Sequence, residues 1–181
     1  MNSKVWGVTG RTGTGKTKVI NTLHYRLSSD NISMGGILTR DIRKYGKRTG
    51  IEIMNISTGI TFELADIDKK TGPRLQKFRI NIDNINNLII DELYQSSTKA
   101  ELIIIDMIGP MELFSNKFCD LLQSLLNEDK KILCAIQTKF DHPIIKEIKK
   151  SANLELHDLN DKHKVEVIDS IYKSIIEELK K

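Results

Sequence analysis

The chain has 181 residues, of which 39% are hydrophobic and 29% are charged, a balance that excludes an intrinsically disordered protein. This length predicts one domain, spanning residues 1–181, that is large enough to bury a core of its own. No apolar run approaches the ~18 residues of a membrane span, and the N-terminus lacks the apolar core of a signal peptide. We therefore expect a cytoplasmic protein with no membrane contact, present as a monomer or a small homo-oligomer.

The chain is weakly basic, and its two cysteines are too few for a disulfide framework or a four-cysteine zinc site. Lys and Arg number 28 against 24 Asp and Glu, which gives a net charge of +4. A dedicated nucleic-acid binder concentrates its basic residues more strongly, whereas here they are spread, with local excesses at 40–48 and 146–150. We expect a solvated basic surface that favours anionic small molecules, and weak nucleic-acid binding stays an open alternative.

Apolar runs and helical stripes alternate through the first half of the chain. The run at 5–8 predicts a buried strand, and the apolar positions within 19–27 predict one face of a helix. Residues 32–39 predict a second extended segment. Two strand-like runs, at 50–56 and 60–64, are separated by a turn sequence, and together they predict a β-hairpin.

The second half continues this alternation. Its predicted elements are a helix over 85–93, a strand over 102–105, a helical face over 114–125, a strand over 132–136, a helix from Pro143, a short strand at 154–156 and a helix over 168–179. Asp83 is expected to cap the first of these helices, and Leu88 and Phe114 are expected to lie on buried faces. The alternation predicts an α/β fold with a mostly parallel sheet, into which the hairpin at 50–64 is inserted.

The strongest signal is a glycine-rich segment between the first predicted strand and the first predicted helix. It matches the phosphate-binding P-loop pattern without a mismatch, and its residues are Gly10, Arg11, Thr12, Gly13, Thr14, Gly15, Lys16 and Thr17. Glycines let the backbone N–H groups point at phosphate oxygens, and the following helix adds its positive N-terminal end. We expect Lys16 to lie in a solvent-facing loop and reach the β- and γ-phosphates, and the Thr17 hydroxyl to bind Mg²⁺.

A P-loop needs a second carboxylate for its metal ion, at the end of another parallel strand. Asp106 directly follows the apolar run at 102–105, so Thr17 and Asp106 are the predicted Mg²⁺ ligands. No Asn-Lys-x-Asp segment for reading a guanine base follows, and a switch-type GTPase is therefore less favoured. The residues alone predict a protein that binds a nucleoside triphosphate together with Mg²⁺.

The segment that begins at Asp106 carries a wider resemblance. Residues 106–115 read Asp-Met-Ile-Gly-Pro-Met-Glu-Leu-Phe-Ser, which resembles the Asp-Glu-Ile-Gly-(Lys/Pro)-Met-Glu-Leu-Phe-Ser signature of the small P-loop nucleoside-triphosphatases of archaea, bacteria and eukaryotes. Segments at 39–43 and 142–148 are similar to two further stretches of that family. The resemblance implies a three-layer, RecA-like P-loop fold and slow, Mg²⁺-dependent hydrolysis of ATP, GTP and other triphosphates to diphosphate and phosphate. It implies catalytic roles for Lys16, Asp106 and Glu112, and nucleotide binding at Gly109.

Three positions depart from the family pattern. Met107 stands where the family has an acid beside the metal-binding aspartate, and methionine can neither orient nor deprotonate an attacking water. Arg40 replaces another acid of the family. The pair His163-Lys164 stands where the family has Asn-Arg, so an arginine that could stabilise charge becomes a lysine.

Three residues could compensate for these losses, and they are Glu112, Lys139 and Arg48. Glu112 is favoured because its Met-Glu-Leu-Phe-Ser setting is retained in full. The leading hypothesis is a slow nucleoside-triphosphatase. The alternatives are a nucleotide-binding module with little turnover, which Met107 would explain, and a small-molecule or nucleotide kinase, for which the arginines within 40–48 are the only hint.

Overall fold

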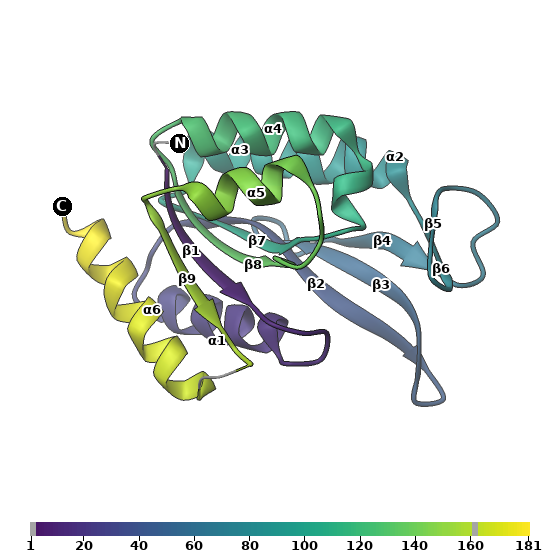
Figure 1. The fold of residues 1–181 in the computed structure, drawn as a ribbon, viewed down its shortest axis with the longest axis horizontal. Helices are drawn as coiled ribbons and strands as arrows, with labels where there is room; N and C mark the ends of the chain where they lie inside the picture. The colour runs from purple at the N-terminus through teal and green to yellow at the C-terminus, as the bar shows by residue number, and fades with distance from the viewer. Residues whose placement is uncertain (1–2, 161–162) are drawn as a thin grey trace.

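A nine-stranded sheet runs through the molecule, and helices cover both of its faces (Figure 1). The computed structural model describes residues 3–160 and 163–181. The strands are β1 (Lys4–Thr9), β2 (Met34–Lys44), β3 (Lys47–Asn55), β4 (Thr61–Asp66), β5 (Arg74–Leu75), β6 (Phe78–Ile80), β7 (Leu102–Ile108), β8 (Lys131–Ile136) and β9 (Leu154–Asp158). Their order in the sheet is β5-β6-β4-β3-β2-β7-β8-β1-β9.

The helices form two layers, one on each face of the sheet (Figure 1). One layer contains α1 (Lys16–Ser29) and α6 (Lys164–Leu179), and the other contains α3 (Ile90–Lys99), α4 (Asn116–Asn127) and α5 (Pro143–Lys150). Shorter elements are α2 (Ile82–Asn84), the π-helical turn η1 (Ile85–Ile89) and the 3-10 turn η2 (Glu112–Phe114). Across the described residues, none of these helices is long and apolar enough to cross a membrane.

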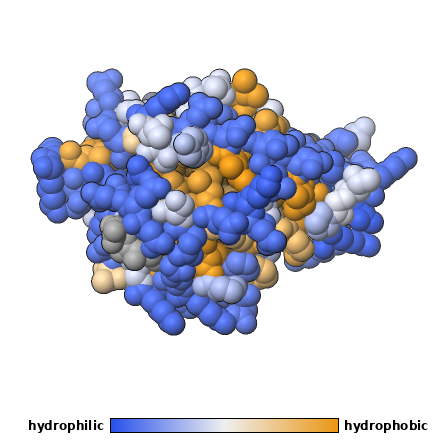
Figure 2. Space-filling model, turned by 90° about the horizontal axis from the view of Figure 1, so that it is seen from above, coloured by the Kyte–Doolittle hydropathy of each residue, from blue (hydrophilic) through white to orange (hydrophobic). Residues whose placement is uncertain are grey.

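The parallel half of the sheet forms the centre of the molecule, as the sequence predicts. Strands β2, β7, β8, β1 and β9 pair in parallel, and residues 102–105 of β7 are fully buried. Alternate residues of each strand point to opposite faces, so Ile103 joins the core beneath α3, α4 and α5, whereas Ile104 joins the core beneath α1 and α6. The outer surface of the α3–α5 layer is mainly hydrophilic (Figure 2). The three-layer α/β fold is confirmed.

The antiparallel half of the sheet is larger than the predicted hairpin. The hairpin at 50–64 is present as β3 and β4, but β2 also pairs with β3, and β6 pairs with β4 and β5. Strands β2 and β3 are joined by Tyr45 and Gly46, whose φ angles are 51° and 75°. Such two-residue turns usually carry Asn-Gly or Asp-Gly, so the Tyr-Gly pair gave no turn signal.

Two details of the helix prediction are wrong. Asn81, not Asp83, caps the helix after β6, because the Asn81 side chain accepts a hydrogen bond from the Asn84 N–H at 3.2 Å. Leu88 is 43% exposed, since residues 85–89 form a π-helical turn that breaks the 3.6-residue period on which the prediction rests.

Phe114 is also misplaced by the sequence pattern. It is 45% exposed and ends the short turn η2, whereas α4 begins only at Asn116. The Ser115 hydroxyl caps α4 by accepting a hydrogen bond from the Phe118 N–H at 3.0 Å. The apolar stripe of the helix therefore starts with Phe118, which is fully buried.

A buried carboxylate joins α3 to the strands that lead to the P-loop cavity. Glu92 is 4% exposed and accepts hydrogen bonds from the Gly36 N–H at 2.9 Å and from the hydroxyls of Ser57 and Ser96 at 2.7 Å. The Asn55 amide donates a fourth bond at 2.5 Å. Because all of these donors are buried or partly buried, the carboxylate holds the start of β2 in place.

We expect Glu92→Ala to lower the free energy of unfolding by about 3 kcal/mol or more, because several buried donors lose their acceptor together. Urea unfolding measures the change. Asp91→Ala is the matched control, since Asp91 is the exposed neighbour on α3 and should cost less than about 1 kcal/mol. Equal losses in the two variants would contradict the role given to Glu92.

Candidate functional site

The glycine-rich segment forms a tight loop between β1 and α1. Gly10, Gly13 and Gly15 have φ angles of 147°, 86° and 93°, which residues with a side chain rarely adopt. The Thr14 N–H and hydroxyl donate to the Arg11 carbonyl at 3.2 and 2.9 Å and close the loop. The loop opens directly into the N-terminus of α1, so backbone N–H groups and the positive helix end meet at one point.

Lys16 lies differently from the prediction. It is the first residue of α1, not part of a solvent-facing loop, and only 7% of it is exposed. Its ammonium donates to the carbonyls of Gly10 at 2.9 Å and Arg11 at 3.2 Å, so the side chain folds back under the loop. Burial lowers the pKa of Lys16, and the nearby carboxylates of Asp106 and Asp158 oppose that shift.

Asp106 joins three elements of the fold. It lies fully buried on β7, where its carboxylate accepts hydrogen bonds from the Thr17 hydroxyl at 3.2 Å and the Thr39 hydroxyl at 2.8 Å. The Thr39 N–H adds a longer contact at 3.4 Å. Burial raises the pKa of Asp106, and the hydrogen bonds and the charge of Lys16 partly offset the rise. The structure thus brings the two predicted metal ligands into contact.

The side-chain oxygen atoms of Thr17 and Asp106 suit a hard cation as ligands. A carboxylate and a hydroxyl are oxygen ligands of the kind that Mg²⁺ takes, with waters and phosphates supplying the rest. The described residues contain no cluster of three or more His, Cys, Asp or Glu side chains that could hold a metal by themselves. The pair of Thr17 and Asp106 therefore fits an ion that is shared with a phosphate ligand and does not form an all-protein cage.

The segment after Asp106 brings a second carboxylate to the site. Glu112 on η2 is 2% exposed, and burial raises its pKa to about 8, with the negative charge of Asp106 adding to the effect. Gly109 makes room for this arrangement, because a Cβ there would lie 2.6 Å from Met107 Cε and 3.4 Å from Glu112 Oε2. The side chains of Met107 and Glu112 therefore both lie close to Gly109, and both line the same cavity.

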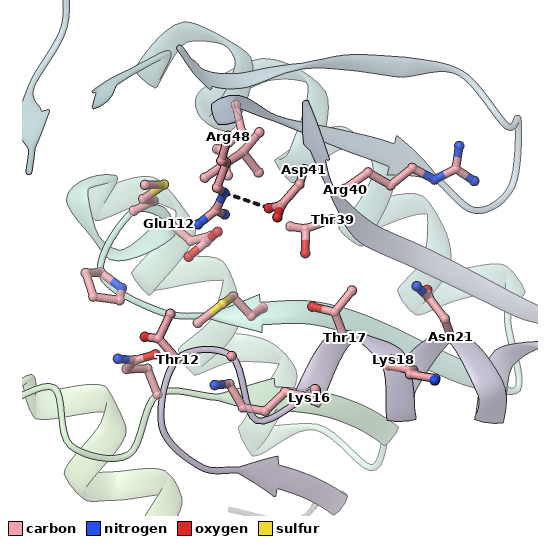
Figure 3. Close-up of a pocket in the computed structure, with 18 of the residues that line it drawn as sticks. Thr12, Lys16, Thr17, Lys18, Asn21, Thr39, Arg40, Asp41, Arg48 and Glu112 are labelled. Atoms are coloured by element: carbon pink, nitrogen blue, oxygen red, sulfur yellow. Dashed lines mark ion pairs between the residues drawn. The ribbon is translucent and has the colours of Figure 1, made fainter. Parts of the chain in front are cut away.

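That cavity has a volume of about 980 Å³ and is bounded by the P-loop, α1, the β2–β3 hairpin and the 107–112 segment (Figure 3). Basic side chains outnumber carboxylates in its lining. The lining cations are Lys16, Lys18, Arg40, Arg43 and Arg48, and the lining carboxylates are Asp41 and Glu112. A concave site of this charge attracts a polyanion such as a triphosphate.

Most of the predicted loop residues reach this cavity, but not all of them. Those in its lining are Thr12, Gly13, Gly15, Lys16 and Thr17. Gly10 and Arg11 line a much smaller hollow beside it, together with the exposed Lys139. Lys139 is therefore not brought to the main cavity, whereas Arg48 is.

Two contributors were not recognised as site residues in the sequence. Thr39 lies at the point where β2 emerges from the core, and no local pattern shows that its hydroxyl bonds to Asp106. Lys164, which the sequence shows only as the residue at the family's arginine position, is the first residue of α6, and its Nζ lies 3.1 Å from where a Cβ on Gly15 would lie. The cation that stands at the family's arginine position thus lies against the P-loop.

Comparison with known proteins agrees with this geometry. A family model described as NTPase matches residues 6–172. The nucleoside-triphosphatase THEP1 of Methanosarcina acetivorans is 34% identical over 144 residues, which cover 79% of this chain and 81% of the relative. THEP1 of Thermotoga petrophila is 32% identical over 173 residues, which cover 96% of this chain and 91% of the relative.

Solved structures show the same fold. The crystal structure of THEP1 from Aquifex aeolicus has a TM-score of 0.81 at 25% identity, covering 94% of this chain and 98% of that one. The solution structure of a human cancer-related nucleoside triphosphatase has a TM-score of 0.79 at 23% identity, covering 95% of this chain and 97% of that one, and it shares the fold. With a family match over residues 6–172 and relatives above 30% identity along most of the chain, this protein belongs to the NTPase family.

Proposed function

We propose that this protein hydrolyses nucleoside triphosphates such as ATP and GTP to the diphosphate and phosphate, slowly and with Mg²⁺. The observation that carries the proposal is that Lys16 and Thr17 line one cationic cavity of about 980 Å³, and that the Thr17 hydroxyl donates to the buried Asp106 carboxylate. Relatives that are more than 30% identical over most of this chain are named nucleoside-triphosphatases. The family match favours hydrolysis over the kinase hypothesis.

Phosphate binding is the task of the loop and of Lys16. Residues of the loop and of the first turn of α1 line the cavity, and the Lys16 ammonium adds a full positive charge beside them. Gly109 is not among the described residues that line the cavity, and we propose that it leaves room for Glu112, whereas nucleotide binding at Gly109 stays a prediction.

Thr17 and Asp106 would hold the Mg²⁺ ion, and Thr39 would keep the Asp106 carboxylate turned toward it. When bound, the ion neutralises phosphate charge as the terminal phosphoryl group departs. Neutralisation by a bound cation would also remove the cost of ionising a carboxyl as deeply buried as Asp106.

Glu112 is the residue that we assign to the attacking water. A water oxygen forms a bond to the γ-phosphorus, the bond from that phosphorus to the β-phosphate oxygen breaks, and the water proton passes to the Glu112 carboxylate. A base with a pKa near the working pH suits this transfer, and burial sets the pKa of Glu112 at about 8. Met107 carries no proton acceptor, and a binding module with little turnover therefore stays the second candidate.

We predict that Lys16→Ala weakens triphosphate binding by about 10²-fold or more, because charge-assisted bonds to phosphate are lost. Isothermal titration calorimetry with ATP and Mg²⁺ measures the dissociation constant. Lys150→Ala, which removes an exposed lysine at the end of α5, is the control and should bind as the wild type does. Unchanged affinity in a folded Lys16→Ala protein would contradict the assignment of the loop.

We predict that Asp106→Asn lowers kcat by at least about 10²-fold and raises the Mg²⁺ concentration needed for half-maximal activity. Phosphate release measured across a Mg²⁺ titration separates the two effects. If the variant kept the wild-type Mg²⁺ dependence, Asp106 would not be a metal ligand.

For Glu112 we predict a pH signature. A general base acts when deprotonated, so wild-type kcat should rise between about pH 7 and pH 9 as Glu112 loses its proton. Glu112→Gln should lose about 10²-fold in kcat together with this rise, and Met107→Glu should change kcat little. A large gain in Met107→Glu with full activity in Glu112→Gln would move the base to position 107, and no effect in either variant would favour the binding module.

A further inference from the structure

One arginine in the cavity has no role in the mechanism above. Arg48 comes from β3 and lines the cavity, and in the view of Figure 3 its guanidinium lies toward Asp41 and away from Lys16. The side chain is 36% exposed, so the guanidinium is partly buried and still accessible to a ligand. Arg40, by contrast, extends away from this part of the cavity (Figure 3).

Two contacts hold the Arg48 guanidinium in place. Its Nε lies 2.6 Å from Asp41 Oδ1, and its central carbon lies 5.4 Å from the centre of the Phe78 ring. Within residues 3–160 and 163–181, the two Nη atoms make no hydrogen bond, and the buried Nε also has no hydrogen-bond partner, so Asp41 holds it as an ion pair only. An arginine that is fixed on one edge and keeps donors free on the other is pre-organised for a planar, multiply charged acceptor such as a phosphoryl group.

One face of β2 contacts both Arg48 on β3 and Asp106 on β7. Asp41 bridges two arginines, because its Oδ2 lies 2.9 Å from Arg43 Nη2. Thr39, two residues earlier on β2, points to the same side of the strand and donates to Asp106. This face of β2 therefore contacts Asp106 through Thr39 and Arg48 through Asp41, and it links the positions of the two side chains.

We propose that Arg48 is a catalytic residue that donates hydrogen bonds to phosphate oxygens as the terminal phosphoryl group leaves, and that Asp41 is its positioning residue. The proposal rests on the proposed function. As the γ-phosphorus bonds to the water oxygen, the bond to the β-phosphate oxygen breaks, and negative charge develops on that leaving oxygen. The water proton passes to Glu112. The guanidinium stabilises the charge that is spread over the γ-phosphoryl oxygens in the transition state more than it stabilises the ground state, so it raises kcat more than it tightens binding.

The test compares kcat and KM for ATP in wild type, Arg48→Ala and Arg48→Lys. Arg48→Ala should lose about 10²-fold or more in kcat, with KM changed by less than about threefold. Arg48→Lys keeps the charge but loses the planar fork, and its kcat should fall between the other two. Low-millimolar guanidinium chloride should restore part of the kcat of Arg48→Ala and leave the wild type unchanged, a rescue that a purely structural role would not show.

A double-mutant cycle tests Asp41. Asp41→Asn should lower kcat by about tenfold at nearly constant KM, because the guanidinium loses the charge that orients it. Adding Asp41→Asn to Arg48→Ala should cost nothing more, since Asp41 acts through Arg48. Full additivity of the two losses would overturn the positioning role.

Arg79→Gln is the matched control. Arg79 on β6 carries the same guanidinium group and donates to the Gly72 carbonyl at 3.0 Å, but it does not line the cavity, so kcat should stay within about twofold of wild type. Melting temperatures of all variants exclude unfolding as the cause of a loss. The proposal is overturned if folded Arg48→Ala keeps its kcat, loses only affinity, or gains nothing from guanidinium. An absence of phosphate release by the wild type would instead overturn the proposed function.

Discussion

The site depends on one buried carboxylate. Asp106 is fully buried, and a charged group at that depth is tolerated only with partners that compensate for lost water. Two hydroxyls provide part of that compensation, one from the first turn of α1 and one from β2. Through these bonds the P-loop helix, the central strand β7 and the β2–β3 hairpin are held around one point, and the cavity forms between them.

The parts of the site that lie close together in sequence could be predicted. The P-loop is a contiguous pattern whose glycines match their backbone angles, and Asp106 follows an unbroken apolar run that only a central parallel strand explains. The contribution of Thr39 could not be predicted, because it comes from a strand 67 residues away in the chain. Leu88 and Phe114 were misplaced for a local reason, since a π-helical turn and a 3-10 turn interrupt the regular period.

Met107 stands where the family pattern has an acid, and in the structure its side chain lies near Gly109 and Glu112. Its side chain ends 2.6 Å from where a Cβ on Gly109 would lie, and Glu112 Oε2 lies 3.4 Å from the same point. A carboxylate thus remains within the cavity although the neighbour of Asp106 has none. The apolar surroundings raise the pKa of Glu112 to about 8, which suits proton transfer and costs stability when the carboxyl ionises.

The most direct measurement is phosphate release by the wild-type protein with ATP, GTP, CTP and UTP, each with Mg²⁺ and with a chelator in its place. In the proposed function, the P-loop and Lys16 bind the phosphates and the pair of Thr17 and Asp106 would hold Mg²⁺, so we expect slow release from all four triphosphates and none without the metal. Release that persists in the chelator, or no release from any triphosphate with Mg²⁺ present, would contradict it.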